Sequence, residues 1–401
     1  MSPESEPSIL LVTMDRASES VVFTRSDGRE AHLPLTHSPF EATSTVARFA
    51  HTGAFDALLA TTTAGDDVAL ELPARDGTDQ RDGRLAVYLD QNKWRDVTNA
   101  LTGIGRTTPA ELEAARQLAH WVGERKIVLP VSAAHWAETT KWSDTDKRYQ
   151  LGLTMLRLGR GWQMRDPLQV RRDELRAALA RHGATHAEAP VDAVFTLAPD
   201  VIHGAARGWT PARVPADLPS EQRFQLVALR STAALIDVML DTERVPPGSV
   251  SGWVESHQRF SDWLDSEKRD ARQKRRSVDV FFLNDIRMDI ATEARAARLA
   301  PAAASAWVTE HATGDLAAAP ALGLLREMFH ERHLNKGTTW RTNDLTDMLY
   351  LSCAAGYADF VVCERAMGGA LKQGVERLRR PVRIFPRLSD VVEAIEDALK
   401  P

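Results

Sequence analysis

Cysteine is scarce in this 401-residue chain, which contains only Cys353 and Cys363. Two cysteines are too few for a disulfide framework or a cysteine-based zinc site, so we interpret both as reduced core thiols. No apolar run approaches the ~18 residues of a membrane span, and the N-terminus lacks the features of a signal peptide. We therefore expect a cytoplasmic protein with no membrane partner.

Several catalytic motifs and a global positive charge are also missing. The chain has no Gly-x-x-x-x-Gly-Lys-Ser/Thr loop, no Gly-x-Ser-x-Gly elbow and no His-Glu-x-x-His pair, which removes the usual signatures of P-loop, serine-hydrolase and zinc-protease chemistry. The formal net charge is −5 at pH 7. Any binding of nucleic acid must therefore depend on local basic patches.

What is present is an ordinary globular composition, with 43% hydrophobic and 26% charged residues, and a length typical of two or three domains. Strand-like and helical patterns alternate at both ends of a long helical block, which predicts an α/β framework split by an insertion. Within the N-terminal part, residues 40–59 carry helical spacing. We predict a small N-terminal α+β unit at residues 1–73, a linker at 74–84, an α/β domain at 85–143 and 336–401, and a helical insertion at 144–335.

The most informative stretch is residues 85–89, an apolar strand that ends abruptly on Asp90 and is followed by Asn92. A second short apolar strand, residues 360–363, ends on Glu364. Ligands of open α/β sheets bind beyond the carboxyl ends of the strands, so Asp90 and Glu364 should meet at one edge. Asp359, which precedes the second strand, should lie at the opposite edge and is excluded from the site.

Three further acids fall where helices begin near this edge. Glu138 follows a strand at 127–131 within a helix that Ser132 caps, and Asp344 and Asp347 open a helix over residues 344–355. Clustered carboxylates repel one another unless a cation intervenes, and hard oxygen ligands suit Mg²⁺ or Mn²⁺. Such ions activate water for in-line phosphodiester cleavage without a protein nucleophile. Each acid also has a structural explanation, as a helix N-terminal acid, a surface acid or a turn residue.

The order of these motifs resembles the PIN-domain nucleases. In that superfamily a first strand ends in Asp, a later helix supplies Glu, another helix begins with one or two acids, and a following strand closes on a further acid. The resemblance rests on the motifs ending at Asp90, Glu138, Asp347 and Glu364, and covers about a third of the chain. It implies a three-layer α/β/α domain around a parallel sheet, Mg²⁺ or Mn²⁺ dependence, and endonucleolytic cleavage of RNA, less often DNA.

The resemblance also assigns roles to residues. Asp90, Glu138, Asp344 and Asp347 would bind metal, and Asn92 would orient Asp90 or a metal-bound water. Glu364 stands where Asp is commoner, so we expect it to bind metal only through water or not at all. His135, three positions before Glu138 on the same helix, either joins the metals or packs in the core.

One strongly basic segment is the candidate for phosphate contacts. Its cations are Lys268, Arg269, Arg272, Lys274, Arg275 and Arg276. The alternative is a solvated helix face balanced by Asp265, Glu267 and Asp270. Tryptophans with helical spacing could stack on unpaired bases or belong to the core. They are Trp94, Trp136, Trp142, Trp253, Trp263 and Trp340.

Two other functions are compatible with part of this pattern. A haloacid-dehalogenase phosphatase also begins with a strand-end Asp, but it needs a second Asp two residues later, where this chain has Asn92. The other alternative is a catalytically decayed PIN-like module that binds a protein or nucleic-acid partner. A protein inhibitor and a homodimer are compatible with either hypothesis.

Overall fold

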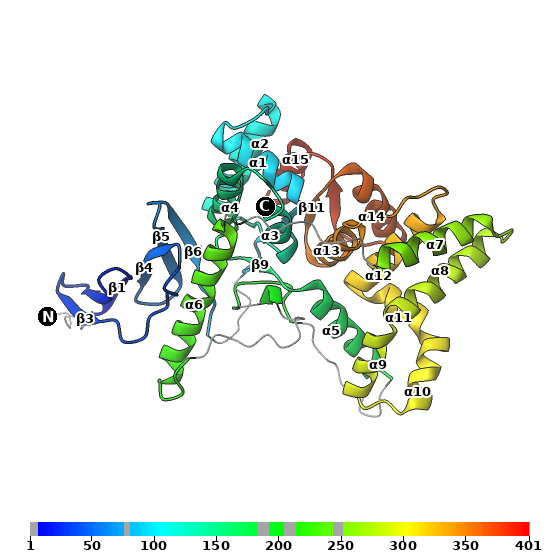
Figure 1. Ribbon diagram of the computed structural model, residues 1–401, viewed down its shortest axis with the longest axis horizontal. Helices are drawn as coiled ribbons and strands as arrows, with labels where there is room; N and C mark the ends of the chain where they lie inside the picture. The colour runs from blue at the N-terminus through cyan, green and yellow to red at the C-terminus, as the bar shows by residue number, and fades with distance from the viewer. Residues whose placement is uncertain are drawn as a thin grey trace.

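The computed structural model (Figure 1) describes residues 7–75, 81–182, 192–199, 201–203, 214–241, 243 and 252–400. The predicted linker lies partly outside these ranges, because residues 76–80 are not among them. None of the helices in this described part of the chain has the length and hydropathy that a membrane span requires.

Strands occur in three sheets and helices fill most of the remaining chain. The strands are β1 Ile9–Asp15, β2 Ser20–Arg25, β3 Glu30–Pro34, β4 Val46–Thr52, β5 Ala57–Thr62, β6 Asp67–Glu71, β7 Leu85–Leu89, β8 Ile127–Val128, β9 Gln163–Met164, β10 Phe195–Thr196, β11 Phe360–Val362 and β12 Arg383–Phe385. The helices are α1 Gln91–Thr102, α2 Pro109–Gly123, α3 Ala133–Thr139, α4 Thr145–Gly159, α5 Pro167–Ala180, α6 Ser220–Leu240, α7 Gly252–Ser266, α8 Ala271–Asp285, α9 Arg287–Ala296, α10 Pro301–Ala306, α11 Ala312–Ala318, α12 Pro320–Leu334, α13 Asp344–Tyr357, α14 Arg365–Leu378 and α15 Leu388–Ala398, with short segments η1 Val201–His203 and η2 Trp307–His311.

The sheet that positions the site has the order β12-β11-β7-β8, and its neighbouring strands are parallel. β11 pairs with β7 so that Val362 lies opposite Leu89, and the Asp90 amide donates to the Val362 carbonyl at 2.9 Å. The predicted adjacency of the strands that end at Asp90 and Glu364 is confirmed. Asp359 lies at the other end, where its carboxylate accepts from the Ala86 amide.

The two faces of this sheet feed two hydrophobic cores, because successive side chains of a strand point to opposite faces. Ala86 and Tyr88 enter one core with α5, α12, α13 and α14. Val87 and Leu89 enter the other with α1, α2, α4 and α15. The chain is therefore mixed α/β, with helices on both faces of a parallel sheet.

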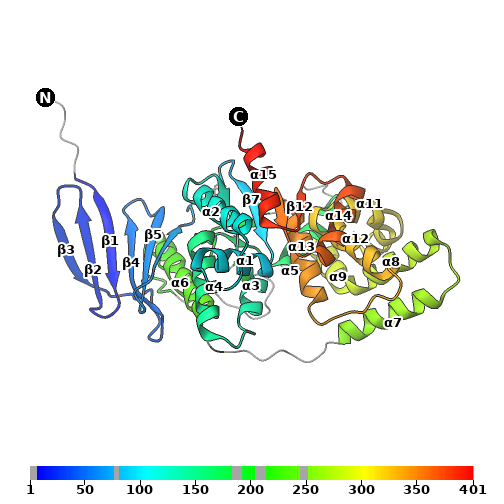
Figure 2. The ribbon, with the colours of Figure 1, turned by 90° about the horizontal axis from the view of Figure 1, so that it is seen from above.

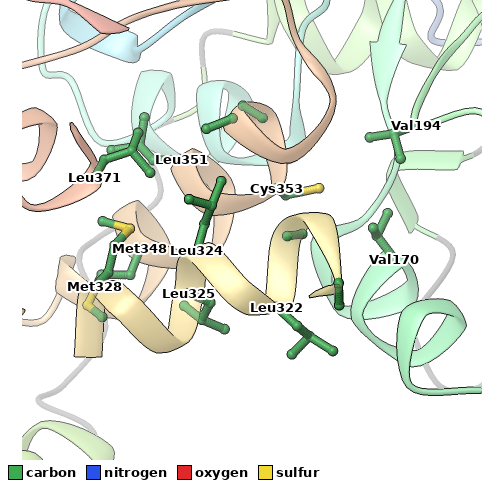
Figure 3. Packing of buried hydrophobic residues seen from close by; sticks show 14 of the residues in the cluster. Val170, Val194, Leu322, Leu324, Leu325, Met328, Met348, Leu351, Cys353 and Leu371 are labelled. Atoms are coloured by element: carbon green, nitrogen blue, oxygen red, sulfur yellow. The ribbon is translucent and has the colours of Figure 1, made fainter. Parts of the chain in front are cut away.

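Packing between α12 and α13 fixes the helix that carries Asp347. Figure 3 shows Leu324 and Met328 of α12 facing Met348 and Leu351 of α13, and all four side chains are buried. At the other end of α13, a Cβ on Gly356 would lie 2.8 Å from the backbone nitrogen of Ala321. The two helices can approach this closely only because residue 356 is glycine.

The N-terminal unit differs from the prediction, because residues 46–52 and 57–62 are strands and the unit is an antiparallel sheet of order β3-β2-β1-β4-β5-β6 (Figure 2). The predicted helix at 40–59, and with it the α+β description, is wrong. A register shift between Val46 and Arg48 turns Val46 and Phe49 to the same buried side. Two inward residues three positions apart imitate helical spacing.

Two other predictions need adjustment. The insertion is largely helical, as predicted, but it includes the short antiparallel pair β9 and β10. Arg84, placed in the linker, is buried and forms an ion pair with buried Glu71 at 3.0 Å. The last linker residue therefore ties the N-terminal sheet to the start of β7.

Candidate active site at the carboxyl edge of the parallel sheet

The carboxyl ends of β7 and β11 form a topological switch point. From β7 the chain continues through α1 and α2 to β8, and from β11 it continues through α14 to β12, on the opposite face. Asp90 precedes α1, where its side chain accepts from the Gln91 amide at 2.8 Å, and Glu364 precedes α14. Divergence of two helices from neighbouring strands opens the crevice in which α/β proteins bind ligands.

Glu138 reaches the same edge because a buried polar network holds α3 against β7 and α1. The Tyr88 and Ser132 hydroxyls lie 3.1 Å apart, and the buried Gln91 side chain donates to the Thr139 hydroxyl at 2.8 Å. Buried hydrogen bonds are costly to leave unmade, so they fix the relative placement of these elements. Glu138 lies on α3 one residue before Thr139.

Asp347 lies one turn into α13, and Asp344 begins that helix. The buried Asp344 carboxylate accepts from the Arg332 side chain and, at 2.8 Å, from the Arg341 amide. Its contacts thus identify it as an ion-paired residue that closes the helix start. The metal-ligand role predicted for Asp344 is not supported by these contacts.

Asp90, Glu138 and Asp347 each have a raised pKa, because each is largely buried and lies near other negative charges. Burial raises the pKa of Asp347 to about 8, with further contributions from Glu138 and Asp90. Burial and the charge of Asp90 raise the pKa of Glu138 to about 7. Burial raises the pKa of Asp90 too, and Glu364 adds to that shift. Side chains from α3, α13 and two strand ends therefore lie near enough to influence one another electrostatically, and their predicted role as one metal site stays a prediction.

This carboxylate group, defined as Asp90, Glu138, Asp347 and Glu364, has no ion-pair partner among the described residues. Lys93 and Lys141 act on Asp90 and Glu138 only through longer-range attraction. Half-buried acids without a cation are unusual, because the charged form loses hydration and gains no compensating charge. Such a group suits a positively charged ligand supplied from outside the chain.

The arrangement of these residues suits one of the two ways in which proteins bind divalent cations. Within the described part of the chain, no three His, Cys, Asp or Glu side chains stand close enough together to hold a metal ion. Mg²⁺, however, usually keeps several waters and is bound by one or two carboxylates together with substrate phosphates. The donor types and the uncompensated charge fit that mode, whereas a preformed cage of protein ligands does not fit.

Three residues near the group have roles that differ from, or sharpen, the predictions. Asn92 does not contact Asp90 but donates its side-chain amide to the Glu364 carboxylate. His135 is a core residue, since its ring accepts from the Ser132 amide at 3.1 Å and burial lowers its pKa to about 3. Cys363 is a free, buried thiol, as is Cys353. The predicted reduced core thiols are confirmed.

The basic segment lies on and just before α8, in the outer part of the helical region beyond α12 as seen from α1 and α3 (Figures 1 and 2). Arg275 forms an ion pair with buried Glu327 at 3.0 Å, so its contacts argue against the predicted phosphate role. Arg269 pairs with Glu267 at 3.2 Å. The other four cations have no ion-pair partner among the described residues. They are Lys268, Arg272, Lys274 and Arg276.

The tryptophans divide by burial. Trp94 and Trp340 are buried and cannot stack on a base without rearrangement, whereas Trp263 is 38% exposed. Trp136, Trp142 and Trp253 are half-buried. Only Trp263 adjoins the basic segment, since the Arg269 guanidinium lies 4.9 Å from the centre of its ring.

Sequence reasoning missed the residues that hold the group together. Gln91 and Tyr88 flank Asp90 within three positions, and both are buried and hydrogen-bonded to α3 or its cap. A glutamine directly after a strand-end acid is a signal that could have drawn attention to α3. Arg332, which binds Asp344, gave no such signal because it lies in the preceding helix.

Comparison of the chain with family models, with curated proteins and with solved structures finds no match. The functional assignment therefore depends on the residues and on their arrangement.

Proposed function

We propose that this protein is a Mg²⁺- or Mn²⁺-dependent endonuclease with a PIN-like α/β/α domain, and that it hydrolyses phosphodiester bonds of RNA. The observation that carries the proposal is the switch point between β7 and β11, where uncompensated acids from four elements share one edge. Parallel strands with helices on both faces agree with the architecture that the sequence resemblance implies.

In this proposal, one or two of Asp90, Glu138 and Asp347 hold the divalent cation directly, and the rest of its shell is left to water and substrate phosphate. A bound ion supplies Lewis acidity toward the phosphate and lowers the pKa of a coordinated water. Where it does not bind the ion directly, Glu138 has a pKa of about 7 and would be suited to hold or release a proton at its carboxylate. Asn92 keeps Glu364 directed toward the edge without binding the cation itself.

The competing hypothesis is a decayed module that binds a partner without cleavage. Two observations favour it: Asp344 is already paired with Arg332, and no three-ligand group is preformed in the described part of the chain. Both hypotheses place a ligand at the same edge. They differ in whether loss of a single acid removes a chemical step.

The deciding experiment compares wild-type protein with Asp90→Asn in cleavage of mixed RNA and DNA substrates with Mg²⁺ or Mn²⁺. We expect at least a ~1,000-fold loss of cleavage, together with loss of Mn²⁺ binding by calorimetry, because Asp90 is central to the group. At pH 7 the wild-type protein should also release about one to two protons per bound ion, because Glu138 and Asp347 must ionise.

The matched control is Asp359→Asn, the same change at the opposite end of the same strand pair. Its backbone bond from Ala86 can be retained by the amide oxygen, so activity should stay near the wild-type level. An inactive wild-type protein, or unchanged Mn²⁺ affinity in Asp90→Asn, would leave the decayed module as the better description.

A further inference from the structure

A groove of about 780 Å³ lies between α7 and α8, apart from the carboxylate edge. Aromatic side chains and arginines both line it, which is an unusual combination for a surface between two helices. Its lining includes Phe260, Trp263, Arg269, Arg276 and Phe281. The two arginines make the groove a poor match for an apolar helix, and the three aromatic rings make it a poor match for a simple anion.

Planar groups in this groove follow one another from the core to the surface, and the Phe260–Trp263 pair is tilted by 31°. The rings of Phe281 and Phe260 are 4.0 Å apart and nearly parallel, with an interplanar angle of 12°. Trp263 follows, with ring centroids 5.5 Å apart, and the Arg269 guanidinium lies over Trp263 at 4.9 Å. The stack is anchored in the core by Phe281 and ends at the surface on a guanidinium. Unpaired nucleobases stack on both aromatic rings and guanidinium planes.

Positive charge around the groove is left uncompensated. Asp265 accepts from the Gly337 amide and Asp270 caps α8, and neither acid forms an ion pair with a cation of the segment. Arg276 lines the groove, and Arg272 lies one turn before it on α8; neither has an ion-pair partner within the described residues. Of the acids thought to balance this face, only Glu267 pairs with a cation. Local acids therefore balance Arg269 alone, and the exposed cations Arg272 and Arg276 are accessible to phosphates.

We propose that the α7–α8 groove binds an unpaired nucleotide of a single-stranded nucleic acid. The base stacks on the outer face of the Arg269 guanidinium, and Arg276 and Arg272 contact the flanking phosphates. This inference rests on the proposed function in taking nucleic acid as the ligand, but it concerns a second site. The groove would hold substrate at a distance from the carboxylate edge and would give affinity without sequence preference.

The test is fluorescence anisotropy with a labelled single-stranded RNA of mixed sequence, in EDTA and in an Asp90→Asn background, so that binding is measured without cleavage. Arg269→Lys is the decisive variant because it keeps the charge and removes the planar group. We expect about tenfold weaker binding in Arg269→Lys and in Trp263→Leu. Arg272→Gln combined with Arg276→Gln should lower the salt slope by about 1.4. The matched control is Arg295→Gln, an exposed cation of α9 outside the groove, which should bind like the parent.

Duplex RNA of the same sequence should bind at least about tenfold more weakly, because its bases are already stacked. Wild-type affinity in Arg269→Lys, or equal affinity for single strands and duplex, would overturn stacking. Equally tight binding of a polyglutamate peptide would assign the groove to an acidic polypeptide instead. If the wild-type protein cleaves RNA but the groove variants bind RNA like the parent, only the groove inference fails. If the groove variants bind more weakly as expected but the wild-type protein does not cleave, only the proposed nuclease activity fails.

Discussion

Buried Glu327 and the half-buried acids of the carboxylate group have opposite electrostatic surroundings. Glu327 on α12 is 2% exposed and is surrounded by three arginines, Arg275, Arg326 and Arg377. Burial alone would raise its pKa, but the bond from Arg377 and the neighbouring charges outweigh burial and lower it. At the carboxylate edge, Asp347 has no such partner and its pKa rises to about 8.

Ionised Glu327 therefore stabilises the fold, whereas ionised Asp347 destabilises it. Three arginines form ion pairs with Glu327, whereas no described cation forms an ion pair with Asp347. Uncompensated buried acids in a crevice are typical of functional sites, whereas ion-paired ones also serve structure. The comparison supports an external cation at the switch point and predicts opposite responses to the same type of substitution.

The largest effect on stability is expected for Glu327→Gln. Removing the negative charge leaves Arg275 without its acid, while Arg326 keeps Asp279 and Arg377 keeps Glu331. Because Glu327 itself is buried, the free energy of unfolding should still fall by about 3 kcal/mol. Chemical denaturation at pH 7 measures this change. Because the pKa of Glu327 is lowered in the fold, its stabilisation is present above the unfolded value and is lost as pH falls through the folded value.

The control on the same helix is Glu331→Gln. Glu331 also pairs with Arg377, at 2.8 Å, but its side chain is 28% exposed, so the loss should stay within about 1 kcal/mol. Equal losses for the two variants would mean that the Glu327 cluster is not a distinct structural centre.

Asp347→Asn should have the opposite sign. The folded protein binds a proton on Asp347 up to about pH 8, while the unfolded chain releases it near the ordinary value of 3.8. Stability therefore declines as pH rises between these values, and the variant removes that decline. We expect the free energy of unfolding to rise by about 1–3 kcal/mol at pH 8, in EDTA, with little change at pH 4. A variant that is less stable than wild type at pH 8 would mean that Asp347 is compensated after all.

The sequence predicted the switch point because its elements are local. Residues 85–89 form a short apolar strand that stops on an acid, and the carboxyl ends of parallel strands must share an edge. Asp90, Glu138, Asp347 and Glu364 were assigned to this edge in the same way, and their role as a metal site stays a prediction. The helix start at Ser132 was also correct, because capping residues act within one turn of the chain.

What the sequence could not predict depends on long-range contacts or on backbone irregularity. Arg275 looked like a surface cation until α8 packed on α12 and placed it beside Glu327, 52 residues away. Asp344 looked like a ligand until Arg332 was placed against it. The bulge at Val46 made two strands look like a helix, because it moved buried positions from a period of two to a spacing of three.

The smallest effect concerns Glu364, which belongs to the uncompensated group but is exposed and held by Asn92. Its extra methylene, relative to Asp, extends the carboxylate by roughly 1.5 Å, and Mg²⁺ requires near-ideal ligand distances. We expect Glu364 to act through water, so Glu364→Gln should slow cleavage by about tenfold or less, far below the loss in Asp90→Asn. Mn²⁺, which tolerates less regular coordination, should support faster cleavage than Mg²⁺. Single-turnover cleavage with each metal measures both effects, and equal inactivity of the two variants would make Glu364 a direct ligand.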